Sequence, residues 1–269
     1  MNIDTEKFAL KIRKKVLHMV HNANASHVGS CFSIIDILCV LYGSVIKFDP
    51  TKPKLITRDR FILSKGHAAA AVYAILAELN FINQSDLDHY GDDGSLLMTH
   101  VNHKIPGVEL STGSLGHGLP FGAGKALVAK RLNQDWRTYV LMSDGEMDAG
   151  SNWEALMFSA HHKLDNLIAI IDYNKLQSLT SIENTLGLEP LVDKLIAFGW
   201  SVKEVNGHNH EELTRSIESA PWVKGKPSIL IAHTTKGKGV SFMENKVEWH
   251  YTSPNSEQLS IALKELGED

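Results

Sequence analysis

Cysteine is scarce in this chain, which has only Cys31 and Cys39 among its 269 residues. The two do not form a C-x-x-C pair, and a disulfide scaffold is not expected in a protein of this size. Long hydrophobic runs are also missing, so the sequence predicts no membrane span. The first ten residues include Asp4 and Glu6 and lack the apolar region of a signal peptide. These absences predict a protein of the reducing, cytoplasmic compartment.

An excess of positive charge is absent as well. The formal net charge is −4 and the isoelectric point is near 6.4, so no basic field points to nucleic acid. The basic stretch from Lys11 to Lys15 is interpreted as the solvated face of a helix. Hydrophobic residues make up 43% of the chain, which is enough for a substantial core. We therefore expect neither nucleic acid nor a membrane as a partner.

The hydrophobic pattern alternates between two periods. Phe8, Ile12, Val16 and Val20 recur at helical spacing and predict an amphipathic first helix. Strands are expected at 61–63, 139–142, 167–171, 200–205 and 228–232, and further helices at 33–46, up to 79, up to about 132, and at 152–162, 191–198 and 211–219. This alternation predicts one α/β domain, spanning 1–269, around a mainly parallel sheet. The tail after Val240 is less regular and is expected to cross the surface or reach a partner.

An acidic turn with a glycine, in the stretch SDGEMDAG, follows the strand expected at 139–142. Asp144 lies at the carboxyl end of that strand, where ligands bind to parallel sheets, and Gly145 allows a close backbone approach. The amides of the following helix favour a phosphate, whereas several acidic side chains would repel it. A hard cation such as Mg²⁺ removes this conflict by bridging a carboxylate and a diphosphate.

Further oxygen ligands follow the next expected strand, in the stretch IDYNKL. Asn174 comes 30 residues after Asp144, which fits a strand–helix–strand unit. Its amide oxygen would ligate without adding negative charge, and the carbonyl of Leu176 would supply another oxygen. Taken separately, Asp144 and Asn174 are better explained as ordinary capping and turn residues, but the pair in its strand context favours a metal site.

The spacing of SDGE and Asn174 resembles the thiamine-diphosphate motif, in which G-D-G is followed after about 26 residues by N-N. Further blocks resemble the transketolase family in the same order: ANASHVGS, FILSKGH, PGVELSTGSLGHG, GSNWEA and TTKGKGVSFMEN followed by WH. The resemblance covers nearly the whole chain and is greatest to the N-terminal half, which is a separate subunit in split transketolases. It implies a three-layer, thiamine-diphosphate-binding α/β fold with a mainly parallel central sheet flanked by helices.

The resemblance also implies roles for individual residues. His67 would reach the cofactor diphosphate, and His27 would line the substrate channel and assist proton transfer. His100 matches another family histidine, with His103 as a competing candidate. The implied catalytic residues are His27, His100 and His250; the implied cofactor-binding residues are His67, Gly113, Leu115, Asp144, Gly145, Glu146, Asn174, Leu176 and His250; and the implied ligands of Mg²⁺, or of Ca²⁺ or Mn²⁺ in its place, are Asp144, Asn174 and Leu176.

Other positions leave alternatives open. Lys236 and Lys238 either line the entrance of the site or are solvated loop charges, and His117 either reaches the cofactor or simply packs. Ala149 stands where the family often has a glutamate that lies at the subunit interface and couples paired sites. Asp148, one residue earlier, is a candidate to compensate.

The resemblance further implies that catalysis needs a second domain. In the family, a glutamate of the pyrimidine-binding domain activates the cofactor, and that domain would begin after Asp269. We therefore expect a separate partner chain of roughly 300 residues and a heterotetramer. The expected reaction transfers a two-carbon ketol unit from a ketose, often phosphorylated, to an aldose. The alternatives are a branched nucleotide-sugar synthase, a sulfosugar transketolase, a relative of deoxyxylulose-phosphate synthase, or a non-catalytic scaffold subunit that keeps the fold.

Overall fold

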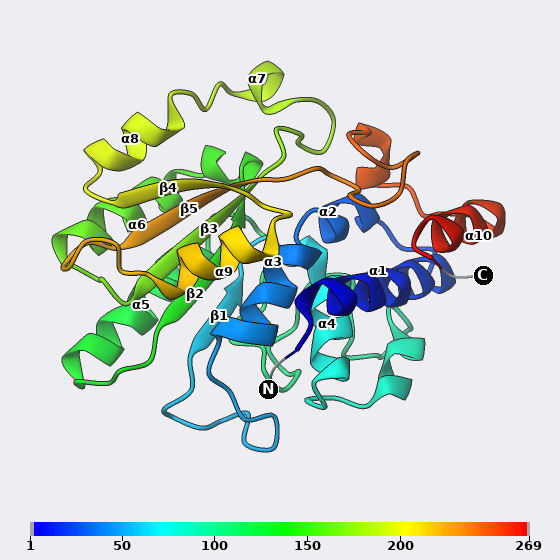
Figure 1. Ribbon diagram of the computed structural model, residues 1–269, viewed down its shortest axis with the longest axis horizontal. Helices are drawn as coiled ribbons and strands as arrows, with labels where there is room; N and C mark the ends of the chain where they lie inside the picture. Colours follow the sequence, from blue (N-terminus) through cyan, green and yellow to red (C-terminus); the bar gives the residue numbers. More distant parts are fainter. Residues whose placement is uncertain (1–2, 268–269) are drawn as a thin grey trace.

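A five-stranded parallel sheet forms the centre of the computed structural model, which describes residues 3–267 (Figure 1). The strands are β1 (Arg60–Leu63), β2 (Thr138–Ser143), β3 (Leu167–Tyr173), β4 (Ser201–Asn206) and β5 (Ser228–His233). Their order across the sheet is β1-β2-β3-β5-β4, and all neighbouring strands run parallel. The predicted α/β fold with a parallel sheet is confirmed.

Helices cover both faces of this sheet and make it the middle of three layers. The helices are α1 (Thr5–Asn22), α2 (Val28–Phe32), α3 (Ile35–Val40), α4 (Ala69–Glu78), α5 (Gly118–Arg131), α6 (Gly150–His161), α7 (Ile182–Thr185), α8 (Leu191–Ala197), α9 (His210–Glu218) and α10 (Ser256–Glu265). Shorter helical turns are η1 (Leu41–Val45), η2 (Gly66–Ala68), η3 (Gln84–His89), η4 (Gly145–Asp148) and η5 (Val247–His250).

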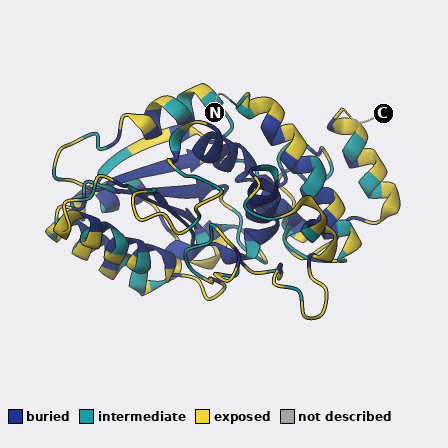
Figure 2. Ribbon diagram, turned by 90° about the horizontal axis from the view of Figure 1, so that it is seen from below, coloured by how far each residue is buried: buried dark blue, intermediate teal, exposed yellow. Residues whose placement is uncertain are grey.

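Alternating strand residues divide the interior into two apolar clusters. In β2, Tyr139 and Leu141 join the cluster with α1, α3, α4 and α9, whereas Val140 and Met142 join the cluster with α5, α6 and α8. This follows from the two-residue period of a strand, whose side chains point to opposite faces. Figure 2 shows the result, with buried strands and inner helices inside a shell of exposed outer helix faces.

Register places the ends of the central strands at one level. Ser143 of β2 pairs with Asp172 of β3, and Asp172 pairs with Ala232 of β5. The segments that follow these residues therefore leave the sheet side by side. This edge is where ligands bind in parallel sheets.

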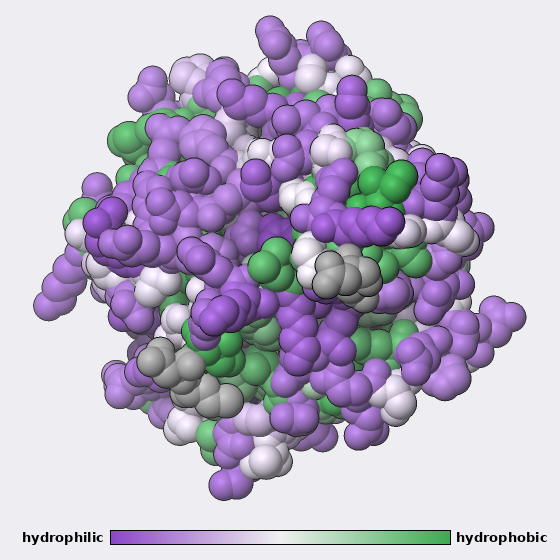
Figure 3. Space-filling view, turned by 45° about the vertical axis from the view of Figure 1, so that its right-hand side comes forward, coloured by the Kyte–Doolittle hydropathy of each residue, from purple (hydrophilic) through white to green (hydrophobic). Residues whose placement is uncertain are grey.

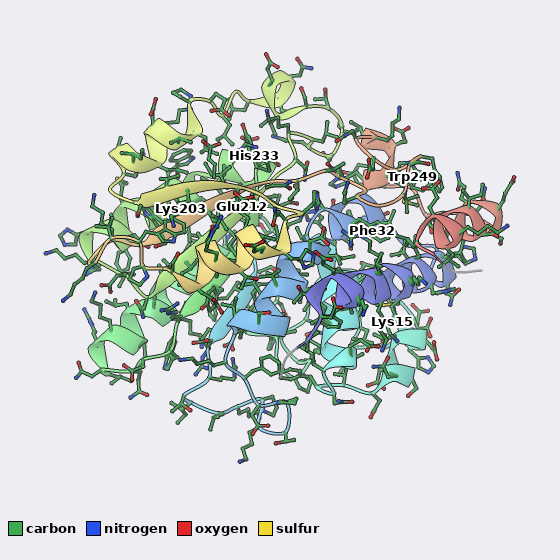
Figure 4. All side chains as sticks on the ribbon, in the orientation of Figure 1. Lys15, Phe32, Lys203, Glu212, His233 and Trp249 are labelled. Atoms are coloured by element: carbon green, nitrogen blue, oxygen red, sulfur yellow. The ribbon has the colours of Figure 1, made fainter. Side chains whose placement is uncertain are left out.

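Two expectations about the helices hold only in part. The segment after Val240 is less regular over 241–246 and 251–255, but it also forms η5 and α10, and α10 packs along α1. The stretch Lys11 to Lys15 is not uniformly solvated, because Arg13 is only 5% exposed and binds Asp36 of α3. Lys15 lies on the side of α1 that faces α4, where it pairs with Glu78 (Figure 4).

The surface is of mixed polarity. Figure 3 shows hydrophilic side chains over most of one face, with hydrophobic ones in small groups between them. Within residues 3–267, no helix combines the length and the hydrophobicity needed to cross a membrane.

Candidate active site

A cavity of about 240 Å³ lies at the carboxyl ends of β1, β2, β3 and β5. The segment after β1 contributes Lys65 and His67, the segment after β2 contributes Asp144, and the segment after β3 contributes Asn174. The full lining is His27, Ser30, Lys65, His67, His100, Gly113, Leu115, Ser143, Asp144, Gly145, Asn174, Leu176, Gln177, Ser178, Lys236, His250 and Tyr251.

Asp144 carries the acidic group of this cavity. It is 1% exposed, and its carboxylate accepts hydrogen bonds from the backbone N–H groups of Gly145 (2.7 Å) and Lys175 (2.6 Å). These bonds use one oxygen each and leave further lone pairs free. Burial, and then the charge of Asp172, raises the pKa of Asp144 to about 7. A cation at this position would remove the cost of burying the carboxylate.

Asn174 is held by Asp172 at the end of β3 and by Leu176 in the segment that follows. Its Nδ2 donates to Asp172 Oδ2 at 3.2 Å, and its Oδ1 accepts from the Leu176 N–H at 3.0 Å. Asp172 also accepts from Lys65 Nζ at 2.5 Å and from Ser33 Oγ at 2.6 Å. These contacts fix which end of the Asn174 amide is the oxygen.

The donor set of this region suits a small hard cation. Asp144 offers a carboxylate, Asn174 an amide oxygen, and the lining residue Leu176 a carbonyl, which accepts from Lys236 Nζ at 3.4 Å; all three are oxygen donors of the kind Mg²⁺ takes. Among residues 3–267, no three His, Cys, Asp or Glu side chains converge as a metal site. The candidate set does not need such a cluster, because only one of its three members is a carboxylate.

Four histidines, His27, His67, His100 and His250, line the cavity together. The ring of His27 lies 5.1 Å from that of His67, 5.8 Å from that of His100 and 5.1 Å from that of His250, measured between centroids. The buried Nδ1 of His27 has no hydrogen-bond partner among the described residues. A buried polar atom of this kind fits a site that is completed by a ligand.

Packing of the chain end brings His250 to His27. The turn η5 packs against α2, as the labelled Trp249 and Phe32 indicate (Figure 4). The backbone N–H of His27 donates to the carbonyl of His250 at 2.8 Å. His27 has a φ of +79°, an uncommon conformation for a non-glycine residue, which places its ring at the start of α2.

Position in the fold favours His100 over His103. Both are exposed, but only His100 belongs to the cavity lining, whereas the Nδ1 of His103 lies 2.7 Å from Ser111 Oγ. His117 is also outside the lining, with its Nδ1 3.1 Å from the carbonyl of Leu115.

Glu146 belongs to the acidic motif but is turned away from the cavity. Its buried carboxylate accepts from Ser64 Oγ and from the backbone N–H groups of Gly116 (2.9 Å) and Ser143 (3.3 Å). It therefore ties the loop that carries Gly113 and Leu115 to the ends of β1 and β2. The structure gives Glu146 a supporting position instead of a lining one.

Two buried lysines were missed or left open by the sequence. Lys65 was not a candidate, yet it is 1% exposed and lines the cavity. Lys236 is 2% exposed, and its Nζ donates to the Gln177 carbonyl (3.2 Å) and to His250 Nδ1 (2.9 Å), so it is not a solvated loop charge. Lys238, by contrast, is a solvated loop charge, and it pairs at the surface with Glu244. The available signal was the expected diphosphate, whose charge would call for cations beyond one metal ion.

Asp148 and Ala149 lie at the rim of this region. Asp148 Oδ2 accepts from Gln177 Nε2 at 2.9 Å, so its carboxylate holds a lining residue of the same chain. Ala149 packs against Gly116, where an added Cβ would lie 2.5 Å from the Cβ of Ala149. Compensation by Asp148 for the family's interface glutamate stays a prediction.

The sequence as a whole matches one family model, that of the thiamine diphosphate binding domain of transketolase, over residues 4–269. The chain belongs to the transketolase family. The predicted family and the predicted transketolase-type transferase class are confirmed.

Individual transketolases agree with this assignment. The chain is 44% identical to an apulose-4-phosphate transketolase subunit of Phocaeicola vulgatus, covering 100% of this chain and 96% of that protein. It is 39% identical to a 6-deoxy-6-sulfo-D-fructose transketolase subunit of a Clostridium species, covering 98% and 95%. The crystal structure of transketolase from Campylobacter jejuni superposes with a TM-score of 0.94 at 31% identity, covering 100% of this chain and 44% of that chain. This chain therefore spans less than half of that solved transketolase.

Three of the cavity histidines should make the stability of the fold depend on pH. Burial lowers the pKa of His27 to about 4 and, with the charge of Lys236, that of His250 to about 3, from ordinary values of 6.5; the pKa of His67 is lowered as well. The unfolded chain then binds more protons than the folded chain below pH 6.5, so stability falls as pH decreases from 6.5 toward 4. Urea unfolding across this range should show the fall, and it should be shallower in a His27→Asn/His250→Asn variant. Equal slopes for the two proteins would contradict the prediction.

Proposed function

We propose that this chain is the diphosphate-binding subunit of a split, cytoplasmic transketolase, which transfers a two-carbon ketol unit from a ketose, often phosphorylated, to an aldose acceptor. The observation that carries the proposal is the cavity itself, which Asp144 and Asn174 line together with a cluster of four histidines. Two relatives that match over nearly their whole length are named as transketolase subunits, which supports the same division of the enzyme.

Each part of the cavity has a role in this proposal. Asp144, Asn174 and the Leu176 carbonyl would hold Mg²⁺. The ammonium group of Lys236 would offset charge of the diphosphate, whereas the charge of Lys65 is already paired with that of Asp172. Thiamine diphosphate, when bound, supplies the electron sink for breaking and forming the carbon–carbon bond.

In this proposal the histidines form hydrogen bonds with the hydroxyl groups of the sugar. His27, His100 and His250 face the cavity from three separate segments, so they can donate to or accept from several hydroxyl groups of one substrate. Because burial keeps His27 and His250 neutral near pH 7, each ring has one donor and one acceptor nitrogen. Lys236 occupies the acceptor nitrogen of His250, which leaves its Nε2–H to donate.

A partner chain that carries the pyrimidine-binding domain completes the site in this proposal, and the assembly is a heterotetramer. The outer face of α5 and α6 is a suitable contact surface, because the two helices pack together and expose several apolar side chains. These are Val128 (49% exposed), Leu132 (64%), Met157 (57%) and Phe158 (40%), with Leu115 (37%) at the edge of the cavity. Gly124 lies among them on α5, and nothing within 4 Å would meet a Cβ there.

Gly124 provides a test of this surface. Replacing Gly124 by leucine is expected to raise the helix stability of the isolated chain by roughly 0.5–1 kcal/mol, since glycine is a poor helix residue. The same side chain is expected to weaken assembly with the partner about tenfold or more, because overpacking an interface costs about 1–3 kcal/mol. Analytical ultracentrifugation of the co-purified subunits measures this effect. Ser260→Leu on the exposed side of α10 is the matched control, and equal assembly of both variants would exclude α5–α6 as the interface.

The sugar donor can be assigned by activity. The chain is co-purified with the product of the adjacent reading frame and supplied with thiamine diphosphate, Mg²⁺ and pairs of ketose and aldose phosphates. Apulose 4-phosphate and 6-deoxy-6-sulfofructose are included as donors, because relatives carry these names. Turnover with any pair supports the proposal. Cofactor binding without turnover on any pair would favour a different sugar substrate, such as a nucleotide sugar, or a scaffold subunit.

A further inference from the structure

A buried charged cluster lies outside the cavity, between α1, α3 and the start of α9, which are neighbours in Figure 1. Its centre is Asp36, which is 5% exposed. Arg13 donates through Nη1 to Oδ1 (2.9 Å) and through Nη2 to Oδ2 (2.6 Å). His208 Nδ1 lies 2.6 Å from Oδ2, and His210 Nε2 lies 3.1 Å from Oδ1. Each carboxylate oxygen thus receives one guanidinium and one imidazole nitrogen.

Two members of the cluster also bind the turn 235–238, which follows β5. The Nε of Arg13 donates to the carbonyl of Lys238 at 3.1 Å. The backbone N–H of Thr235 donates to His208 Nε2 at 2.8 Å. Because Nε2 of His208 is the acceptor, its proton is on Nδ1 and is donated to the carboxylate. Both ends of the turn are therefore tied to one carboxylate.

Lys236 extends from the middle of this turn into the cavity. Its Nζ lies 2.9 Å from His250 Nδ1 and 3.2 Å from the Gln177 carbonyl. The centre of the turn is held as well, because the N–H of Gly237 donates to the Gly29 carbonyl at 3.1 Å. Gly237 has a φ of +79°, and a Cβ there would lie 2.4 Å from the Met243 carbonyl oxygen. The backbone from which Lys236 extends has little freedom.

We propose that Asp36, acting through His208 and Arg13, is a positioning residue that holds the turn 235–238 and thereby fixes the Lys236 ammonium against His250. Asp36 touches neither the cavity nor a ligand. For catalysis the inference rests on the proposed function, because Lys236 and His250 would then meet diphosphate and sugar. The geometry of the Lys236–His250 contact is independent of that function and can be measured without a cofactor.

His210 offers a matched control. It binds the same carboxylate as His208, but its other ring nitrogen, Nδ1, lies 2.8 Å from Thr5 Oγ1 and does not contact the turn. His208→Phe and His210→Phe therefore remove equivalent contacts to Asp36, while only the first releases Thr235. His208→Gln tests rescue, because one amide can donate to the carboxylate and accept from the turn.

The readout is the ¹⁵N spectrum of the His250 imidazole in the full chain at pH 7. In the native chain, Nδ1 should carry the shift of a hydrogen-bonded acceptor and Nε2 the proton, and Lys236→Met identifies the signal of the broken contact. We expect His208→Phe to give the Lys236→Met spectrum, and His210→Phe and His208→Gln to keep the native one. His208→Ala replaces the phenylalanine variant if that variant does not fold. Identical spectra for the two phenylalanine variants, whether changed or native, would overturn the proposal.

Activity of the assembled enzyme gives a second, separate readout. The His208→Phe/Lys236→Met double variant is expected to lose no more kcat/KM than Lys236→Met alone, because residues that act as a unit are not additive. Additive losses would overturn the positioning role. If the chain binds no thiamine diphosphate, the proposed function fails while the spectra still decide the inference.

Discussion

Replacing Asp144 by asparagine is expected to lower the magnesium-dependent affinity for thiamine diphosphate by at least about 100-fold, since loss of even an outer partner of a metal ligand costs 10–100-fold. Asp144 is the one charged member of the proposed ligand set, and an amide in its place cannot neutralise the cation. Isothermal titration calorimetry of the chain with its partner, with Mg²⁺ or with a chelator, measures the loss.

The control lies four residues further along the same motif. Asp148→Asn removes an exposed carboxylate that binds Gln177 through a single hydrogen bond, and it is expected to change the affinity by less than about threefold. Binding that survives in Asp144→Asn would support the scaffold alternative and contradict the metal assignment.

Loss of affinity should not come with loss of stability. The raised pKa of Asp144, about 7, shows that the fold disfavours its charged form when no cation is bound. Asp144→Asn should therefore leave the free energy of unfolding of the cation-free chain equal or higher at pH 8. A residue that opposes folding and serves binding is typical of a functional site.

Position along the sheet made the core of this site predictable. The apolar runs that precede Asp144 and Asn174 indicate parallel strands, and the carboxyl ends of such strands meet at one edge. The register confirms this reasoning, because Ser143 and Asp172 are paired across β2 and β3. One motif residue still behaves differently: Glu146 stands beside Asp144 in the sequence but binds the Gly116 loop inside the fold. Proximity in a motif does not tell which way a side chain points.

The two buried lysines of the cavity, Lys65 and Lys236, could not be predicted in the same way. Whether a lysine is solvated or buried depends on a partner, and the partner of Lys65 is Asp172, 107 residues away in sequence. Lys236 likewise depends on His250 and on a turn tied to α1 and to His208, which precedes α9. Only the fold brings these segments together, so the local pattern gave no indication of Lys65 and left Lys236 open between a lining position and a solvated one.

The second prediction with a large expected effect therefore concerns Lys65. Lys65→Met is expected to lower the free energy of unfolding by about 3–5 kcal/mol, because it leaves Asp172 as a buried charge without its ion pair. The pair is 2.5 Å long, and its side chains are 1% and 0% exposed. Urea denaturation of the chain measures the loss. Lys130→Met is the control, because its pair with Asp165 has a similar distance of 2.8 Å but side chains 40% and 26% exposed, and it should cost no more than about 1 kcal/mol.

A double variant separates the lost ion pair from lost packing. In Lys65→Met/Asp172→Asn the buried charge is gone, while the amide oxygen can still accept from Ser33 and Asn174 and the amide nitrogen can donate to the hydroxyl of Thr234. Most of the lost stability should then return, since removing both partners of a buried pair is far less costly than removing one. A double variant as unstable as Lys65→Met would mean that the lysine stem, not its charge, stabilises the fold. With the charge effect confirmed, Asp172 becomes the residue through which one buried lysine fixes the amide of Asn174 at the proposed metal site.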